Sequence, residues 1–198
     1  AQSSELIIEQ AYADVDITNQ GTSENVDEIY ADVGGLIGEI ESDNDYTGGD
    51  IASVKVRDTY AWGNITANNS QNVGGLIGRV DVENDGSNIT TLTSVQRSYA
   101  RGSVTGLANV GGLVGHLDQV SNDEGTSYIL ENNFAMGRVT ELDEDVLTGR
   151  GGLVGQFEEN AHDVLVSEGN YIDEGRTSQD VCNSIISMEG CVVTNIAA

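Results

Sequence analysis

Gly34-Gly35-Leu36-Ile37-Gly38 is the stretch that decides the fold of this chain. The same five letters return at 74–78, while 111–115 and 151–155 differ only by Val in place of Ile. The four starts lie 40, 37 and 40 residues apart. A near-constant period in this range is typical of proteins built from stacked repeats, in which each repeat contacts its neighbours.

Paired glycines let one backbone approach another closely, and the following Leu and Ile or Val supply apolar side chains. A single such segment is a poor strand by propensity. Four of them in register can each form hydrogen bonds to the coil above and the coil below. The pattern therefore predicts an all-β fold, a parallel β-solenoid (β-helix). Its repeat glycines are Gly34, Gly35, Gly38, Gly74, Gly75, Gly78, Gly111, Gly112, Gly115, Gly151, Gly152 and Gly155.

An aromatic residue recurs once per repeat and opens a phrase such as Tyr60-Ala61-Trp62-Gly63-Asn64-Ile65-Thr66. Small and apolar residues alternate there with polar ones, as expected for a strand with one buried face. We interpret the aromatic column as a packing stack, with a sugar-binding platform as the alternative. Trp62, Arg101 and Met136 share one outward column, which is a candidate interaction surface. The aromatic column is Tyr12, Tyr60, Tyr99, Phe134 and Tyr171.

These repeats predict about four to five coils of 37–40 residues, with acidic loops inserted after the glycine strands. We expect one roughly triangular coil per repeat, and two smaller coils per repeat as the alternative. Residues 1–172 hold the solenoid. Residues 173–198 leave the pattern and are expected to form a C-terminal cap or a pairing segment.

The pairing of the aromatic phrase with Val-Gly-Gly-Leu-(Val/Ile)-Gly resembles the GLUG-motif repeats of secreted bacterial surface proteins. These include adhesin-like proteins and the non-catalytic regions of some surface peptidases. The resemblance covers roughly residues 8 to 172, and this chain departs from it by its longer acidic insertions. It implies a parallel β-solenoid displayed outside the cell, and it implies no reaction.

Charge excludes several classes of partner. The chain has 33 Asp and Glu against 8 Lys and Arg, a formal charge of −25. A nucleic acid or an anionic lipid surface needs a positive face, so neither is expected. No apolar run is long enough to cross a membrane. The chain starts at Ala1 without a leader, so we expect that a signal peptide was removed or that the chain was trimmed. Crowded carboxylates are expected to have raised pKa values.

Two cysteines, Cys182 and Cys191, lie near the C-terminus. We predict a disulfide between them, which would fit a secreted protein, with two unpaired thiols as the alternative. Their spacing, with no His nearby, is not a zinc pattern.

The acidic loops resemble the front of a calcium loop, because Ca²⁺ takes carboxylate oxygen ligands. Neither loop has the Glu expected at the twelfth position, so solvated loops are the alternative. No other cofactor is expected. The candidate ligands are Asp43, Asp45, Asp81, Glu83 and Asp85.

No set of nucleophile, base and orienting group appears, so we expect no catalysis. His116 follows the third glycine strand in a variable polar column and is expected to face solvent. His162 lies in an acidic loop.

Two functions remain for an extracellular protein of this kind. One is a structural subunit that assembles head to tail into a filament. Leu6-Ile7-Ile8 and the uncharged segment 190–198 are β-prone ends that could pair between molecules. The other is an adhesin-type module that engages an external ligand. The end segments favour the filament, unless the tail folds back over its own last coil.

Overall fold

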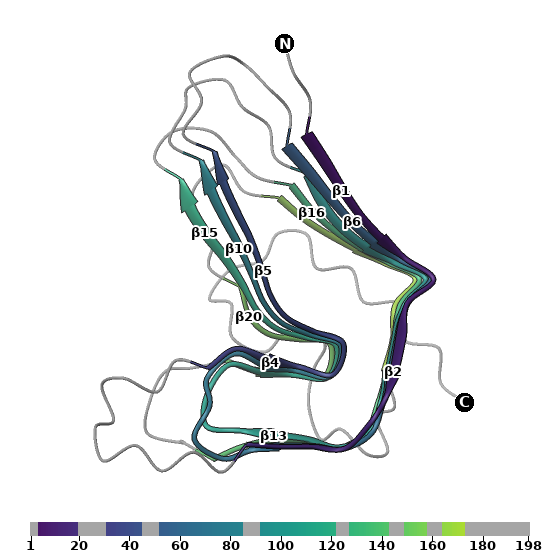
Figure 1. The fold of residues 1–198 in the computed structure, drawn as a ribbon, viewed down its shortest axis with the longest axis vertical. Helices are drawn as coiled ribbons and strands as arrows, with labels where there is room; N and C mark the ends of the chain where they lie inside the picture. The colour runs from purple at the N-terminus through teal and green to yellow at the C-terminus, as the bar shows by residue number, and fades with distance from the viewer. Residues whose placement is uncertain are drawn as a thin grey trace.

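The computed structural model describes residues 4–19, 31–44, 52–84, 92–121, 127–142, 149–157 and 164–172. Each described strand pairs in parallel with the equivalent strand one coil away, and the coils stack along the viewing direction of Figure 1. No helix occurs in these ranges. The predicted parallel β-solenoid is confirmed, with one coil per repeat rather than two smaller ones.

Each complete coil has five strands, and its members follow the chain in order. The first coil holds β1 (Ser4–Glu9), β2 (Tyr12–Asp14), β3 (Ile17–Asn19), β4 (Val33–Gly34) and β5 (Ile37–Asn44). The second holds β6 (Ala52–Arg57), β7 (Tyr60–Trp62), β8 (Ile65–Ala67), β9 (Val73–Gly74) and β10 (Ile77–Asn84). The third holds β11 (Leu92–Gln96), β12 (Tyr99–Arg101), β13 (Val104–Gly106), β14 (Val110–Gly111) and β15 (Val114–Ser121). The fourth holds β16 (Ser127–Glu131), β17 (Phe134–Met136), β18 (Val139–Glu141), β19 (Arg150–Gly151) and β20 (Val154–Phe157). A partial fifth holds β21 (Val164–Glu168) and β22 (Tyr171–Ile172).

The stacked strands form five parallel sheets, which we name after their first strands. The β1 sheet and the β2 sheet have five strands each, and the β3, β4 and β5 sheets have four each. Register is kept from coil to coil: Tyr60 pairs with Tyr12 and Tyr99, and Gly74 pairs with Gly34 and Gly111. The predicted columns of glycines and aromatics are therefore real neighbours in space.

The cross-section of a coil is bent and not triangular, which corrects the sequence-based expectation (Figure 1). Apolar side chains gather in two separate clusters. The larger lies between the β1, β2 and β5 sheets and includes Val56 and Val80, and the smaller joins the β3 and β4 sheets through residues such as Ile65 and Val73. A triangle has one interior, whereas the double glycine adds a sharp corner that folds each coil into two lobes.

The corner between the β4 and β5 sheets explains why two glycines stand together. A Cβ on Gly74 would lie 1.8 Å from the carbonyl oxygen of Ile77 in the same coil. A Cβ on Gly75 would lie 2.1 Å from the carbonyl oxygen of Gly112 in the next coil. The first glycine therefore permits the turn within a coil, and the second permits the close stacking of coils.

Another corner, between the β1 and β2 sheets, uses a column of residues with left-handed backbone conformations. Its members are Gln10, Asp58, Arg97, Asn132 and Gly169, with φ between 47° and 64°. Two positions after each of these residues stands a member of the aromatic column, as in Arg97-Ser98-Tyr99. The position between the left-handed residue and the aromatic residue holds a small or polar residue. Ser98, Asn133 and Asn170 form a buried ladder there: the Ser98 amide donates to Asn133 Oδ1 at 3.0 Å, and the Asn133 amide donates to Asn170 Oδ1 at 2.9 Å. This ladder satisfies backbone groups that the corner takes out of the sheets.

The strands also extend further than the sequence predicts. Segments read as acidic loops continue the β5 sheet as far as Asn44, Asn84 and Ser121. Residues 173–198, with the predicted cap and the Cys182–Cys191 disulfide, lie outside the described residues.

Candidate functional site: an aromatic groove on the β2 sheet

The β2 sheet turns one face to the core and one face to solvent. Its alanines, such as Ala61 and Ala100, are buried in the larger cluster. Because side chains alternate along a strand, the residues on either side of each alanine point outward. We call this outward surface the aromatic face. It has two rows, Tyr12, Tyr60, Tyr99, Phe134 and Tyr171, and Asp14, Trp62, Arg101 and Met136.

Most rings of the first row stack on one another. Tyr12 and Tyr60 lie 5.1 Å apart between ring centroids, Tyr60 and Tyr99 4.9 Å, and Phe134 and Tyr171 4.7 Å, with interplanar angles of 12°, 4° and 11°. The interpretation of this column as a packing stack thus fits the geometry. The spacing follows from the strand separation of a parallel sheet, about 4.8 Å.

The stack is interrupted between the third and fourth coils. Tyr99 and Phe134 are register partners, yet their rings make no stacking contact with each other. Trp62 lies beside both Tyr60 and Tyr99, with ring centroids 5.9 Å and 6.4 Å away and interplanar angles of 49° and 51°. The rings on the two sides of this break therefore keep surface that no neighbouring ring of the first row covers.

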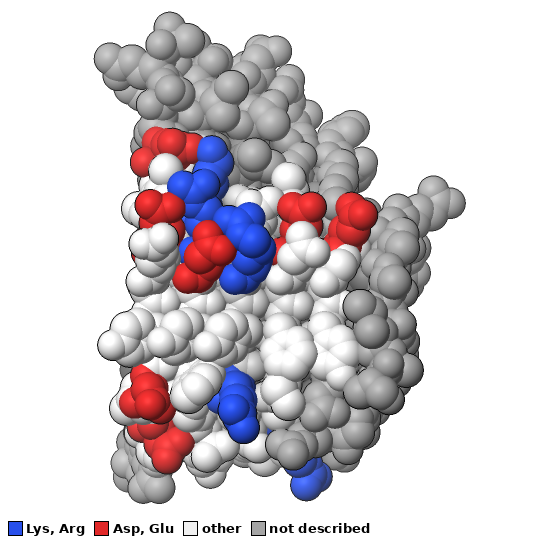
Figure 2. Space-filling model, turned by 90° about the vertical axis from the view of Figure 1, so that its right-hand side faces the viewer, with Lys and Arg blue, Asp and Glu red and all other residues white. Residues whose placement is uncertain are grey.

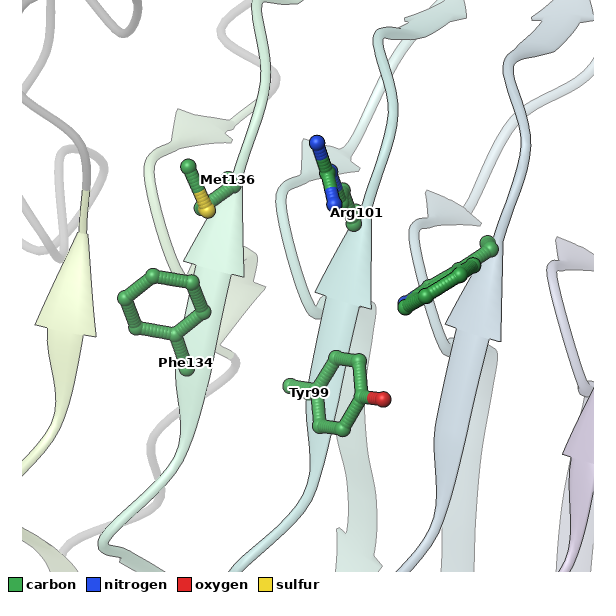
Figure 3. Close-up of a pocket in the computed structure, with 5 residues that line it drawn as sticks. Tyr99, Arg101, Phe134 and Met136 are labelled. Carbon is green, nitrogen blue, oxygen red and sulfur yellow. The ribbon is translucent and has the colours of Figure 1, made fainter.

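An open groove of about 330 Å³ lies at this break. Figure 3 shows Tyr99 and Arg101 rising from one strand and Phe134 and Met136 from the next strand along. Trp62 completes the lining from the second coil and is 40% exposed. We call these five residues the aromatic groove.

The groove carries one cation and no carboxylate. The guanidinium carbon of Arg101 lies 5.6 Å from the centre of the Trp62 ring, a cation–π contact that holds the side chain over the ring. Among the described residues, Arg101 forms no ion pair with an acidic side chain. Partial burial, together with the neighbouring hydroxyls of Tyr99 and Tyr12, raises the pKa of Tyr60, so this ring stays neutral near pH 7.

Charged side chains flank the first row of the aromatic face, and the second row itself contains Asp14 and Arg101. Figure 2 shows an uncharged band across this side of the molecule, with mixed Lys, Arg, Asp and Glu above it and separate acidic and basic groups below. The upper group includes ion pairs of Lys55 with Glu5 and of Arg97 with Asp58. These pairs hold the pKa values of Glu5 and Asp58 below their usual range, contrary to the expectation of raised carboxylate pKa values. Asp32 has a raised pKa, because it is partly buried.

A second polar constellation lies on the β5 sheet, close to the glycine corner. Arg79 pairs with Asp81 at 2.7 Å, with Asp118 of the next coil, and with Glu39 of the preceding coil at 3.5 Å. We call these four residues the ionic cluster. The side chains of Asp81 and Asp118 are only 9% and 11% exposed, so two nearly buried carboxylates share the single positive charge of Arg79.

His116 is not solvent-facing, and the expectation that it would be is wrong. It is the register partner of Arg79 and is 5% exposed. Burial lowers its pKa to about 4, and the nearby Arg79 charge adds to this, while Asp118 opposes it. The equivalent residues Glu39, Arg79 and Gln156 are all more exposed. A polar column in the sequence therefore does not reveal which of its members the neighbouring coils cover.

The structure does not bring the predicted calcium ligands that it describes together in one group. Asp81 belongs to the ionic cluster and faces Arg79. Asp43 and Glu83 are register partners on β5 and β10. Asp45 and Asp85 lie outside the described residues, as does His162. Within the described ranges, no three His, Cys, Asp or Glu side chains are grouped so as to hold a metal ion.

Sequence reasoning found the two rows of the aromatic face but not the break in the first row between Tyr99 and Phe134. The only signal was Phe134 in a column otherwise made of Tyr. Comparison with family models, with curated proteins and with solved structures finds no match to this chain. The resemblance to GLUG-motif repeats therefore stays a prediction from the motif residues. No helix in the described part of the chain has the length and apolar character that a membrane crossing needs.

Proposed function

We propose that this chain is a non-enzymatic, extracellular β-solenoid module that binds an external ligand through the aromatic groove. The observation that carries the proposal is the interrupted ring stack, which leaves ring surface, a thioether and a guanidinium around one open groove. Contiguous exposed apolar surface of this kind commonly marks a binding site. The stacked coils supply a rigid support, because each strand of the groove is hydrogen-bonded on both sides.

The test is adsorption of labelled chain to a panel of surfaces: several immobilised polysaccharides, several immobilised proteins and bare polystyrene. The proposal predicts that at least one surface retains the wild-type chain and releases both Phe134→Ala and Met136→Glu. Tyr12→Ala is the matched control, because it removes an exposed ring of the same face outside the groove. Equal retention of wild type and groove variants on every surface would refute the proposal.

Head-to-tail assembly into a filament is the second candidate. One observation favours it: on the first coil, Leu6, Ile7 and Val15 are 49%, 41% and 53% exposed. Against it, the described residues of that coil carry Asp and Glu and no Lys or Arg, and charged edges oppose strand addition. The segment 190–198 lies outside the described residues. Sedimentation velocity from 0.05 to 1 M NaCl tests this assembly. If filaments form, screening of the acidic edge should increase the size of the sedimenting species. A monomer at every salt concentration would exclude the filament.

Calcium binding by the acidic residues Asp43, Asp45, Asp81, Glu83 and Asp85 is also a proposal. It predicts a rise in melting temperature with CaCl₂ that an equal concentration of MgCl₂ does not reproduce. An equal response to both ions would indicate simple screening of the acidic surface.

A further inference from the structure

The lining of the aromatic groove restricts the ligands that can fill it. Four of its five residues, Trp62, Tyr99, Phe134 and Met136, present ring or thioether surface. Such surface favours a ligand with flat, hydrogen-rich apolar faces, because the face of an aromatic ring is electron-rich. Arg101 and the Tyr99 hydroxyl add hydrogen-bond donors at the same place. The ligand must therefore combine apolar faces with hydrogen-bond acceptors.

Charge narrows the choice further. The chain carries a formal charge of −25, so a polyanion meets a repulsive field over the whole molecule. A cationic ligand meets the Arg101 guanidinium and finds no carboxylate in the groove to pair with. Figure 2 shows one uncharged band across this side of the molecule, with charged groups above and below it. A neutral ligand is repelled neither by the net negative charge of the chain nor by the Arg101 guanidinium.

The arrangement of the strands argues against an extended peptide. Peptides that bind sheets usually add a strand to a free edge, where backbone groups are unpaired. Here β12 is paired with β7 on one side and with β17 on the other, so its backbone has no free edge to which a peptide strand could add. Recognition must come from the side chains alone.

The aromatic face continues along the solenoid axis on both sides of the groove, with stacked rings 4.7–5.1 Å apart between centroids. The groove lies where this stacking is interrupted, between Tyr99 and Phe134, so ring surface is open there to a sugar ring. The sugar rings have apolar C–H faces and carry hydroxyl groups, and both kinds of group have partners in the groove. We infer that the aromatic groove binds a neutral glycan whose chain runs along the solenoid axis. This inference rests on the binding function proposed above.

The sequence provides its own reporter for a test, because Trp62 is the sole tryptophan of the chain and lines the groove. Wild-type chain would be titrated with four neutral hexasaccharides: β-1,4-glucan, β-1,4-linked N-acetylglucosamine, β-1,3-glucan and α-1,4-glucan. We expect at least one of them to change the Trp62 emission saturably. Polygalacturonate, an anionic glycan, should cause no saturable change at 0.1 M NaCl.

Variants then localise the effect. Phe134→Ala and Arg101→Gln should each weaken the binding of that hexasaccharide at least tenfold, whereas Tyr12→Ala, which lies on the same face but outside the groove, should weaken it less. Met136→Glu provides a second groove variant should Phe134→Ala fold poorly, which the far-UV circular dichroism spectrum would show. No emission change with any hexasaccharide, equal binding by the groove variants, or saturable binding of polygalacturonate would each overturn the inference.

Failure of the glycan inference and failure of the proposed binding function give different results. If the surface panel shows retention on a protein coating that depends on Phe134 and Met136, the binding module stands and the glycan inference is wrong. If no surface distinguishes wild type from the groove variants, the proposed function itself is wrong.

Discussion

The glycine corner and the aromatic face are both repeated in every complete coil, but the repetition has different causes. At the corner, backbone lies against backbone: a Cβ on Gly111 would be 1.8 Å from the carbonyl oxygen of Val114, and one on Gly112 would be 2.1 Å from that of Gly152. Nothing larger than hydrogen fits there. On the aromatic face the first row is nearly constant, while the second row changes from Asp14 to Trp62, Arg101 and Met136. The corner therefore determines the fold, and the variable row is where a specific surface can arise.

The largest expected effect comes from filling the corner at the third glycine of the motif, the column of Gly38, Gly78, Gly115 and Gly155. In Gly115→Ala, the new methyl group would lie 2.5 Å from Gly78 O and 2.6 Å from two backbone atoms of Asn72 and Val73. Because backbone atoms of two coils would have to move, we expect a loss of about 3 kcal/mol or more in the free energy of unfolding. Urea denaturation followed by circular dichroism measures it.

Gly38→Ala is the matched control, since Gly38 occupies the same column in the first coil. The nearest atom to its added Cβ is Asp32 O at 3.1 Å. We expect a loss below about 1 kcal/mol, in the range of ordinary substitutions away from the core. Equal losses for the two variants would show that stacking of coils is not what the corner glycines permit.

The ionic cluster next to the corner should give the second effect. Arg79→Leu would leave the carboxylates of Asp81 and Asp118 close together and nearly buried without their shared cation. Breaking a buried pair on one side typically costs about 3 kcal/mol, and we expect a loss of that order in thermal or urea unfolding. Arg97→Gln, which breaks an exposed pair with Asp58, should change stability little.

A third effect concerns pH. The pKa of His116 is about 4 in the folded chain and near 6.5 when unfolded, so the unfolded state binds more protons between these values. Stability contributed by neutral His116 is then present above pH 6.5 and is lost as the pH falls toward 4. Between pH 7 and pH 5 the wild type should lose about 2 kcal/mol that His116→Gln does not lose. Parallel pH profiles for the two proteins would contradict the burial of His116.

The smallest effect should appear on the aromatic face. Tyr60 stacks on rings in both neighbouring coils, whereas Tyr12 stacks on one ring and is 65% exposed. One additional aromatic pair is worth about 1 kcal/mol, so Tyr60→Ala should cost that much more than Tyr12→Ala in urea unfolding. If both variants are as stable as the wild type, the ladder contributes nothing to the fold.

Much of the fold could be predicted because its causes are local and periodic. The glycines of the corner and the aromatics of the ladder each repeat at one coil length, so their columns follow from spacing alone. The bent outline could not be predicted, because the glycine motif does not reveal how sharply the chain turns between the β4 and β5 sheets. The left-handed corner between the β1 and β2 sheets was hidden as well, since its residues, such as Asp58, Arg97 and Asn132, share no residue type. The acidic stretches were assigned to loops because Glu, Asp and Asn are rare in strands, although pairing with adjacent coils extends β5 and β10 through them.

The candidate site was predictable in its members and not in its shape. Trp62, Arg101 and Met136 were placed in one outward column from alternation alone. The groove, however, depends on how Trp62 and Tyr99 lean, which only the packing of neighbouring coils decides. The burial of His116 has the same origin, since its own strand gives no sign of what the adjacent coils cover.

The most direct test of the account is a nuclear Overhauser measurement between methyl groups of the buried alanines of the β2 sheet. Ala61, Ala100 and Ala135 are register partners in successive coils. With one coil per repeat, the methyl group of Ala100 should show direct contacts with those of both Ala61 and Ala135. If these contacts are missing, and the backbone of β12 shows parallel pairing with strands about half a repeat away, each repeat forms two smaller coils and the account is contradicted.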